Sequence, residues 1–132
     1  MLEHTYVLVV DDDAQSRQLM VDLMEMVGIP VKAAENGVEA LMHIRRKPPG
    51  FAIVDLLMPG MHGLTLLSRL KLDLELHRIP TMVITGAPLT AAEVSKLSDS
   101  VLGVIRKGDL SMQDIAYVIE ETLKATQPVS PV

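Results

Sequence analysis

Residues 6–13, Tyr-Val-Leu-Val-Val-Asp-Asp-Asp, decide the fold class of this chain. An apolar, mostly β-branched run without helical spacing is typical of a strand buried on both faces, as the strands of a parallel sheet are. Four further short apolar runs lie at residues 30–34, 51–54, 81–84 and 101–105. The sequence therefore predicts five strands, the first at residues 6–10.

Segments with helical spacing separate the predicted strands. The first segment has four apolar residues spaced to lie on one face of a helix: Leu19, Leu23, Met26 and Val27. Gly28 follows them and provides a stop for that helix. The second segment has a similar stripe: Val38, Leu41 and Ile44. Its basic end, residues 45–47, complements the negative end of a helix dipole, and we prefer this interpretation to a basic docking patch.

Three more helices are predicted downstream. One spans about residues 64–74, and two begin at the capping-box patterns of residues 90–93 and 111–114. The last of them continues with an apolar stripe: Ile115, Val118, Ile119 and Leu123. Five strands alternating with five helices predict an α/β fold with a doubly wound parallel sheet. We expect one domain at residues 1–126 and a proline-containing tail or the start of a linker at residues 127–132.

Composition narrows the function classes. The chain has 132 residues, 17 of them acidic and 12 basic, for a formal net charge of −5, and it has no cysteine. A disulfide framework, a thiolate zinc site and a cysteine nucleophile are thereby excluded. The negative charge and the scarcity of aromatic residues argue against nucleic-acid binding. No apolar run approaches the roughly 20 residues of a membrane span, so we expect a cytoplasmic protein that binds no membrane.

Polar residues follow the predicted strands directly. Residues 11–13 are three aspartates after the first strand, and Asp55 follows the third. Thr85 follows the fourth strand and Lys107 the fifth. Because ligands of such sheets bind outside the carboxyl ends of the strands, these side chains are expected to converge on one edge.

Each of these residues also has an ordinary structural explanation. Asp12 or Asp13 could simply cap the first helix, Thr85 could be a turn hydroxyl, and Lys107 a surface cation. Their combination is more informative. Crowded carboxylates repel one another, so a divalent cation or bound protons must compensate them, and Mg²⁺ suits such a site. A metal and a lysine beside a carboxylate would attract a phosphoryl group, and a threonine hydroxyl could hydrogen-bond it.

The combination resembles the receiver domain of two-component response regulators over nearly the whole chain. Four stretches carry the resemblance: Val-Val-Asp-Asp at residues 9–12, Val-Asp-Leu-Leu-Met-Pro-Gly-Met-His-Gly at 54–63, Ile-Thr-Gly at 84–86, and Lys107. The resemblance implies a flavodoxin-like fold with strand order 2-1-3-4-5. It also implies a phosphoacceptor signalling domain rather than an enzyme.

The resemblance further implies a role for each matching residue. Asp55 would accept the phosphoryl group from a phosphohistidine of a histidine kinase or a histidine phosphotransfer protein. Asp11, Asp12, Asp55 and the backbone carbonyl of Leu57 would bind Mg²⁺. Thr85 would move toward the phosphoryl group, and Lys107 would pair with Asp55 and then with its phosphate. Output-domain contacts or a homodimer would use the fourth helix, the fifth strand and the fifth helix.

The sequence departs from the family pattern at three positions. Val104 stands where an aromatic switch residue is common, Gly108 where a proline usually follows the lysine, and His62 where an aspartate is frequent. These departures leave open a receiver-like interaction module that phosphate does not switch. A phosphohydrolase of the haloacid dehalogenase kind is a second alternative, although Gln15 breaks its nucleophile motif. A flavin-binding flavodoxin is less favoured, because the first loop lacks a Thr/Ser-rich phosphate cradle.

Overall fold

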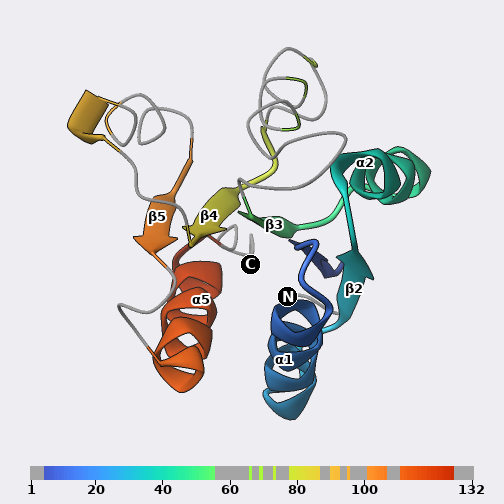
Figure 1. Cartoon of the computed structure of the whole chain (residues 1–132). Helices are drawn as coiled ribbons and strands as arrows, with labels where there is room; N and C mark the ends of the chain where they lie inside the picture. The colour runs from blue at the N-terminus through green and yellow to red at the C-terminus, as the bar shows by residue number, and fades with distance from the viewer. Residues whose placement is uncertain are drawn as a thin grey trace, which may run out of the picture.

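The protein is built on one five-stranded parallel sheet, seen in a computed structural model (Figure 1). The structure describes residues 5–55, 66, 69, 73, 78–86, 90–92, 95, 101–106 and 111–126. The strands are β1 (Val7–Val10), β2 (Val31–Ala34), β3 (Phe51–Asp55), β4 (Thr81–Thr85) and β5 (Gly103–Arg106). Their order is β2-β1-β3-β4-β5, and every neighbouring pair is parallel. The predicted doubly wound sheet and its strand order are confirmed.

Three helices have defined bounds in the described part of the chain: α1 (Ala14–Met26), α2 (Gly37–Arg46) and α5 (Met112–Thr126). Leu66 and Arg69 are helical, within the range expected for a third helix. Ala91, Ala92 and Ser95 are helical as well, where a fourth helix is expected. Asp73, near the end of the predicted third helix, is a bend, and Thr90 lies just before the fourth helix. The remaining residues of these two predicted helices lie outside the described residues. Of the helices that are described, none is long and apolar enough to cross a membrane.

The sheet has a hydrophobic core on each face. On one face α1 and α5 cover Val7, Phe51 and other strand residues, and on the opposite face α2 covers Leu8 and Ala52 (Figure 1). Alternate residues of β1 and β3 therefore point to opposite layers, as a pleated strand requires. The strands β1 and β3 are buried along their whole length, which explains their continuous apolar sequence.

The apolar stripe predicted for α1 is wrong at three of its four residues, since only Leu23 packs against the core. Met20 and Met24 are the buried residues of this helix, whereas Leu19 is exposed and Met26 is 80% exposed. Apolar residues occur on nearly all sides of α1, so two neighbouring sets of residues had the spacing of an apolar helix face. The stripe that contains Met20 and Met24 faces both the sheet and α5. The predicted stop is correct, because Gly28 has a φ of 77° and Ile29 N–H donates to the Met24 carbonyl, as in a Schellman motif.

The other two helices follow their predicted stripes more closely. In α2, Leu41 and Ile44 are buried together with the small residues Gly37 and Ala40, whereas Val38 is 55% exposed. In α5, Ile115 and Ile119 are buried. The predicted cap of α5 is present, since the Asp114 N–H donates to Ser111 Oγ at 3.1 Å. The basic end of α2 is exposed, as expected for a solvated helix end.

Candidate functional site

The carboxyl ends of three central strands carry the polar residues predicted from the sequence. Asp11 directly follows β1, and Asp55 is the last residue of β3. Val10 and Val54 are partners across these two strands, so Asp11 and Asp55 lie level with one another. Thr85 ends β4, one residue beyond Ile84, which is the partner of Asp55. The parallel register alone therefore brings the three side chains to one edge of the sheet.

Three carboxylates gather at this edge. One oxygen from each of Asp11, Asp12 and Asp55 lies within 4.8 Å of the other two. Asp11 and Asp55 are buried, with exposed fractions of 8% and 6%, whereas Asp12 is exposed. The cluster thus has two buried carboxylates, those of Asp11 and Asp55, and one exposed to solvent, that of Asp12.

Backbone N–H groups of the loop between β1 and α1 hold that loop in place through hydrogen bonds. The Asp11 N–H donates to the Ala34 carbonyl of β2 at 3.1 Å, and the Asp13 N–H donates to Asp11 Oδ1 at 2.9 Å. Asp13 caps α1, because its Oδ2 accepts a hydrogen bond from the Ser16 N–H at 2.9 Å. Asp13 therefore has the structural role considered for it, and it is not a member of the three-carboxylate cluster.

Two predicted site residues, Leu57 and Lys107, lie outside the described residues. Thr85 is described and completely buried, and it pairs with Arg106, the residue before Lys107. The structure therefore brings Asp11, Asp12 and Asp55 together, with Thr85 at the same edge.

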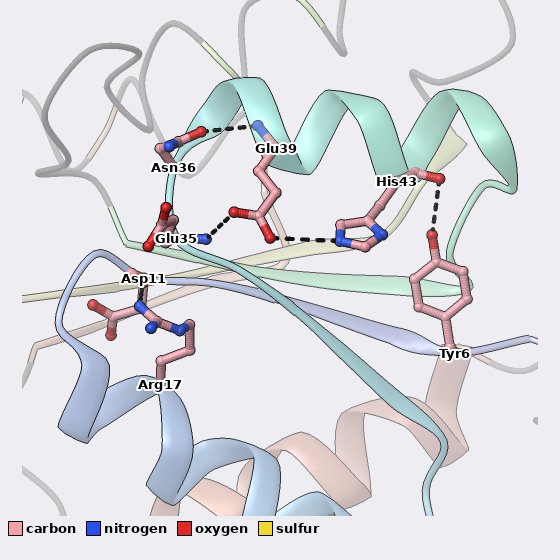
Figure 2. A network of polar contacts seen from close by, with 7 residues as sticks. All are labelled: Tyr6, Asp11, Arg17, Glu35, Asn36, Glu39 and His43. Atoms are coloured by element: carbon pink, nitrogen blue, oxygen red, sulfur yellow. Dashed lines mark hydrogen bonds and ion pairs between the residues drawn. The ribbon is translucent and has the colours of Figure 1, made fainter.

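Sequence reasoning missed one residue beside the cluster. Arg17 Nη1 donates to the backbone carbonyl of Asp11 at 2.8 Å (Figure 2). A cation near the N-terminus of a helix opposes the helix dipole, so it suggests a specific partner nearby. That unfavourable placement is the one signal by which the sequence could have singled out Arg17.

The donor set of the cluster fits a hard divalent cation. Its ligand atoms are carboxylate oxygens, which suit Mg²⁺, Ca²⁺ and Mn²⁺ rather than metals that prefer nitrogen or sulfur. Two buried like charges also need compensation by a nearby positive charge. The acidic cluster could therefore hold a metal ion.

Comparisons with known proteins identify the family of the chain. The family model for the response regulator receiver domain matches residues 7–119. The chain is 32% identical over 81 residues to chemotaxis protein CheY-3 of Vibrio cholerae, covering 61% of this chain and 62% of that protein. It is 31% identical over 124 residues to a protein-glutamate methylesterase/protein-glutamine glutaminase of Archaeoglobus fulgidus. That alignment covers 92% of this chain but 35% of the relative. The chain thus spans less than two thirds of either relative.

Solved structures give the same result. The N-terminal domain of a response regulator receiver protein from Methanoculleus marisnigri superimposes with a TM-score of 0.74 at 25% identity, covering 97% of this chain and 100% of that one. A putative response regulator from Chloroflexus aurantiacus gives a TM-score of 0.79 at 25% identity, covering 91% of this chain and 98% of that one. Together with the family match, these likenesses show that the chain belongs to the response regulator receiver domain family of two-component signalling.

Proposed function

We propose that Asp55 accepts a phosphoryl group in a Mg²⁺-dependent reaction, which makes this chain the phosphoacceptor of a two-component relay. The observation that carries the proposal is the approach of Asp11, Asp12 and Asp55 to within 4.8 Å. Asp55 is the acceptor of the three because it occupies the position of the phosphorylated aspartate in the receiver domains that this chain resembles. The donor is a phosphohistidine of a histidine kinase or a histidine phosphotransfer protein.

The transfer needs only one bond to form and one to break. An Asp55 carboxylate oxygen attacks phosphorus, the P–N bond of the phosphohistidine breaks, and its electron pair stays on the departing imidazole nitrogen. Asp11, Asp12, Asp55 and the Leu57 carbonyl would hold the Mg²⁺. When bound, Mg²⁺ supplies charge that neutralises the phosphoryl oxygens during transfer.

Two further residues would bind the phosphoryl group. Thr85 is buried at the neighbouring strand end, where its hydroxyl could donate to a phosphoryl oxygen. Lys107 follows the partner of Thr85 in the sequence, and its ammonium group would pair with Asp55 and then with the phosphate. Phosphorylation would then shift a two-state equilibrium of the domain.

The shift would be read by a partner or an attached output module. We propose that residues 1–126 form the receiver domain with five helices, that residues 127–132 form a tail or linker, and that the protein acts in the cytoplasm. The readout surface, or a homodimer contact, would be the fourth helix, β5 and α5. The relatives' names include a chemotaxis protein, a methylesterase and a probable transcriptional regulator, so the family serves more than one output.

The test uses acetyl phosphate as a small phosphodonor. Wild-type protein incubated with acetyl phosphate and Mg²⁺ should gain one phosphoryl group by intact mass, and it should gain none without Mg²⁺. Asp55→Asn should gain none. Asp13→Asn is the matched control and should still be phosphorylated, because Asp13 is outside the cluster and asparagine also caps helices. Phosphorylation of Asp55→Asn, or steady hydrolysis of a phosphomonoester by wild type, would contradict the proposal.

A further inference from the structure

Arg17 joins the first turns of α1 to the loop that carries two of the three clustered carboxylates. Its Nη1 donates to the Asp11 carbonyl at 2.8 Å, and Figure 2 shows the side chain reaching from α1 back to Asp11. The bond goes to the backbone carbonyl, not to a carboxylate oxygen of Asp11. Arg17 therefore contacts the loop without occupying a ligand atom of the cluster.

This hydrogen bond adds to two others that Asp11 makes with its surroundings. The Asp11 N–H is bonded to Ala34 of β2, and its Oδ1 accepts the Asp13 N–H. Arg17 adds an attachment from α1 to the remaining backbone group, the carbonyl. These bonds restrain the peptide planes on both sides of the Asp11 Cα, and with them the direction of the Asp11 side chain and the plane of the peptide that leads to Asp12.

The placement of Arg17 has an electrostatic cost. A guanidinium near the N-terminus of α1 opposes the helix dipole, and its charge would repel a cation bound by the nearby carboxylates. If Arg17 acted only through its charge, it would weaken metal binding by the carboxylates. If Arg17 instead holds the loop in place, it strengthens metal binding, because preorganised ligands lose less freedom on binding.

We propose that Arg17 is a positioning residue that holds the Asp11–Asp12 peptide so that both carboxylates face Asp55. This inference rests on the proposed Mg²⁺ site, but the loop geometry can be measured without the metal. The electrostatic and positioning roles predict opposite changes in Mg²⁺ affinity when Arg17 is replaced.

The test compares Arg17→Met with the control Gln18→Met, both in the unphosphorylated protein. Methionine keeps much of the side-chain length and removes both donor and charge. Gln18 is exposed on the same helix, and its amide donates to Asp22 instead of the loop, so the control also loses one side-chain hydrogen bond. The readouts are the Mg²⁺ Kd by calorimetry and the amide hydrogen exchange of Asp13 in the absence of Mg²⁺.

Arg17→Met should raise the Mg²⁺ Kd and speed Asp13 exchange, each by about three- to tenfold, the size expected from one lost hydrogen bond. Arg17→Lys keeps the charge and one donor and should recover part of both losses. Gln18→Met should leave both values at the wild-type level. A lower or unchanged Kd in Arg17→Met, or unchanged Asp13 exchange, would overturn the positioning role. If wild type bound no Mg²⁺, the proposed function would fail, while the exchange result would still decide whether Arg17 holds the loop.

Discussion

Asp11 and Asp55 lie level with one another across the β1–β3 boundary, with carboxylate oxygens within 4.8 Å. Both residues are buried, so water screens their mutual repulsion only weakly. The parallel register, with Val10 opposite Val54, brings them together without any contribution from loop length. A cation bound between these carboxylates would offset their mutual repulsion.

Mg²⁺ should stabilise the protein for this reason. At ten times its Kd, Mg²⁺ should add about 1.4 kcal/mol to the free energy of unfolding, which corresponds to a rise in Tm of about 4–6 °C. Asp12→Asn should lose most of this rise, because it removes one carboxylate of the cluster. The measurement is Tm with and without millimolar Mg²⁺.

Asp13→Asn is the control for this experiment, since it removes the same charge from the same loop but from the helix cap. It should keep the rise in Tm. An equal Mg²⁺ response in wild type and Asp12→Asn would show that the acidic cluster is not the metal site.

Thr85 should be needed for the response to phosphorylation and not for phosphorylation itself. Thr85→Val keeps the side-chain volume at this fully buried position but removes the hydroxyl. The variant should still be phosphorylated at Asp55, while the equilibrium between inactive and active conformations shifts about tenfold toward the inactive form. The amide NMR shifts induced by phosphorylation report that equilibrium. Thr85→Ser keeps the hydroxyl and should respond as wild type does; a full response in Thr85→Val would exclude the role.

Val104 should not act as a rotating switch. It lies on β5 opposite Val83, and its β-branched side chain has one stiff torsion and no ring. Its methyl NMR signals should report little rotamer change on phosphorylation, with the fully buried Val83 as an internal reference. A large rotamer change confined to Val104 would contradict this prediction.

Tyr6 should make the protein less stable at alkaline pH. Its hydroxyl lies 3.2 Å from the His43 carbonyl (Figure 2) and donates to the Lys47 carbonyl at 2.5 Å. Burial raises the pKa of Tyr6 above 10.0. The folded state thus favours the neutral phenol. This stabilisation is fully present below the unfolded-state pKa of about 10 and is lost as the pH rises through the folded-state pKa. Tyr6→Phe should lower the free energy of unfolding by about 1 kcal/mol at pH 7 and reduce its alkaline decline.

Tyr117→Phe provides the control, because Tyr117 is exposed on α5. Its stability should match that of wild type. The chain has two tyrosines and no tryptophan, so tyrosinate absorbance in this variant reports Tyr6 alone. A Tyr6 titration midpoint at or below 10 in folded protein would contradict the prediction.

The sheet could be predicted from the sequence because buried parallel strands leave a simple pattern. Each apolar run corresponds to a strand, with ends displaced by one or two residues. Residues 101 and 102, for example, are apolar but precede β5, and the Leu102 N–H instead donates to the Thr81 carbonyl. The positions of the polar site residues could be predicted as well, since the first polar residue after a buried parallel strand lies at the edge of the sheet where ligands bind.

Other features depend on contacts between elements and could not be predicted in this way. The buried side of α1 is set by its packing between the sheet and α5, and the apolar residues around the helix left two stripes possible. The contact between Arg17 and the Asp11 carbonyl depends on the direction in which α1 leaves the loop, which the linear spacing does not specify. Asn36 as the N-cap of α2 was missed as well, although asparagine is a preferred cap.

The identity of the phosphorylated residue is the decisive test of Asp55 as the phosphoacceptor. Borohydride reduces an aspartyl phosphate to homoserine, so reduction after incubation with acetyl phosphate and Mg²⁺ marks the acceptor covalently. Peptide mass mapping should then find homoserine at position 55 and aspartate at positions 11, 12 and 13. Homoserine at any of those three positions, or an unmodified Asp55 in protein that carries a phosphoryl group, would contradict the assignment of Asp55 as the acceptor.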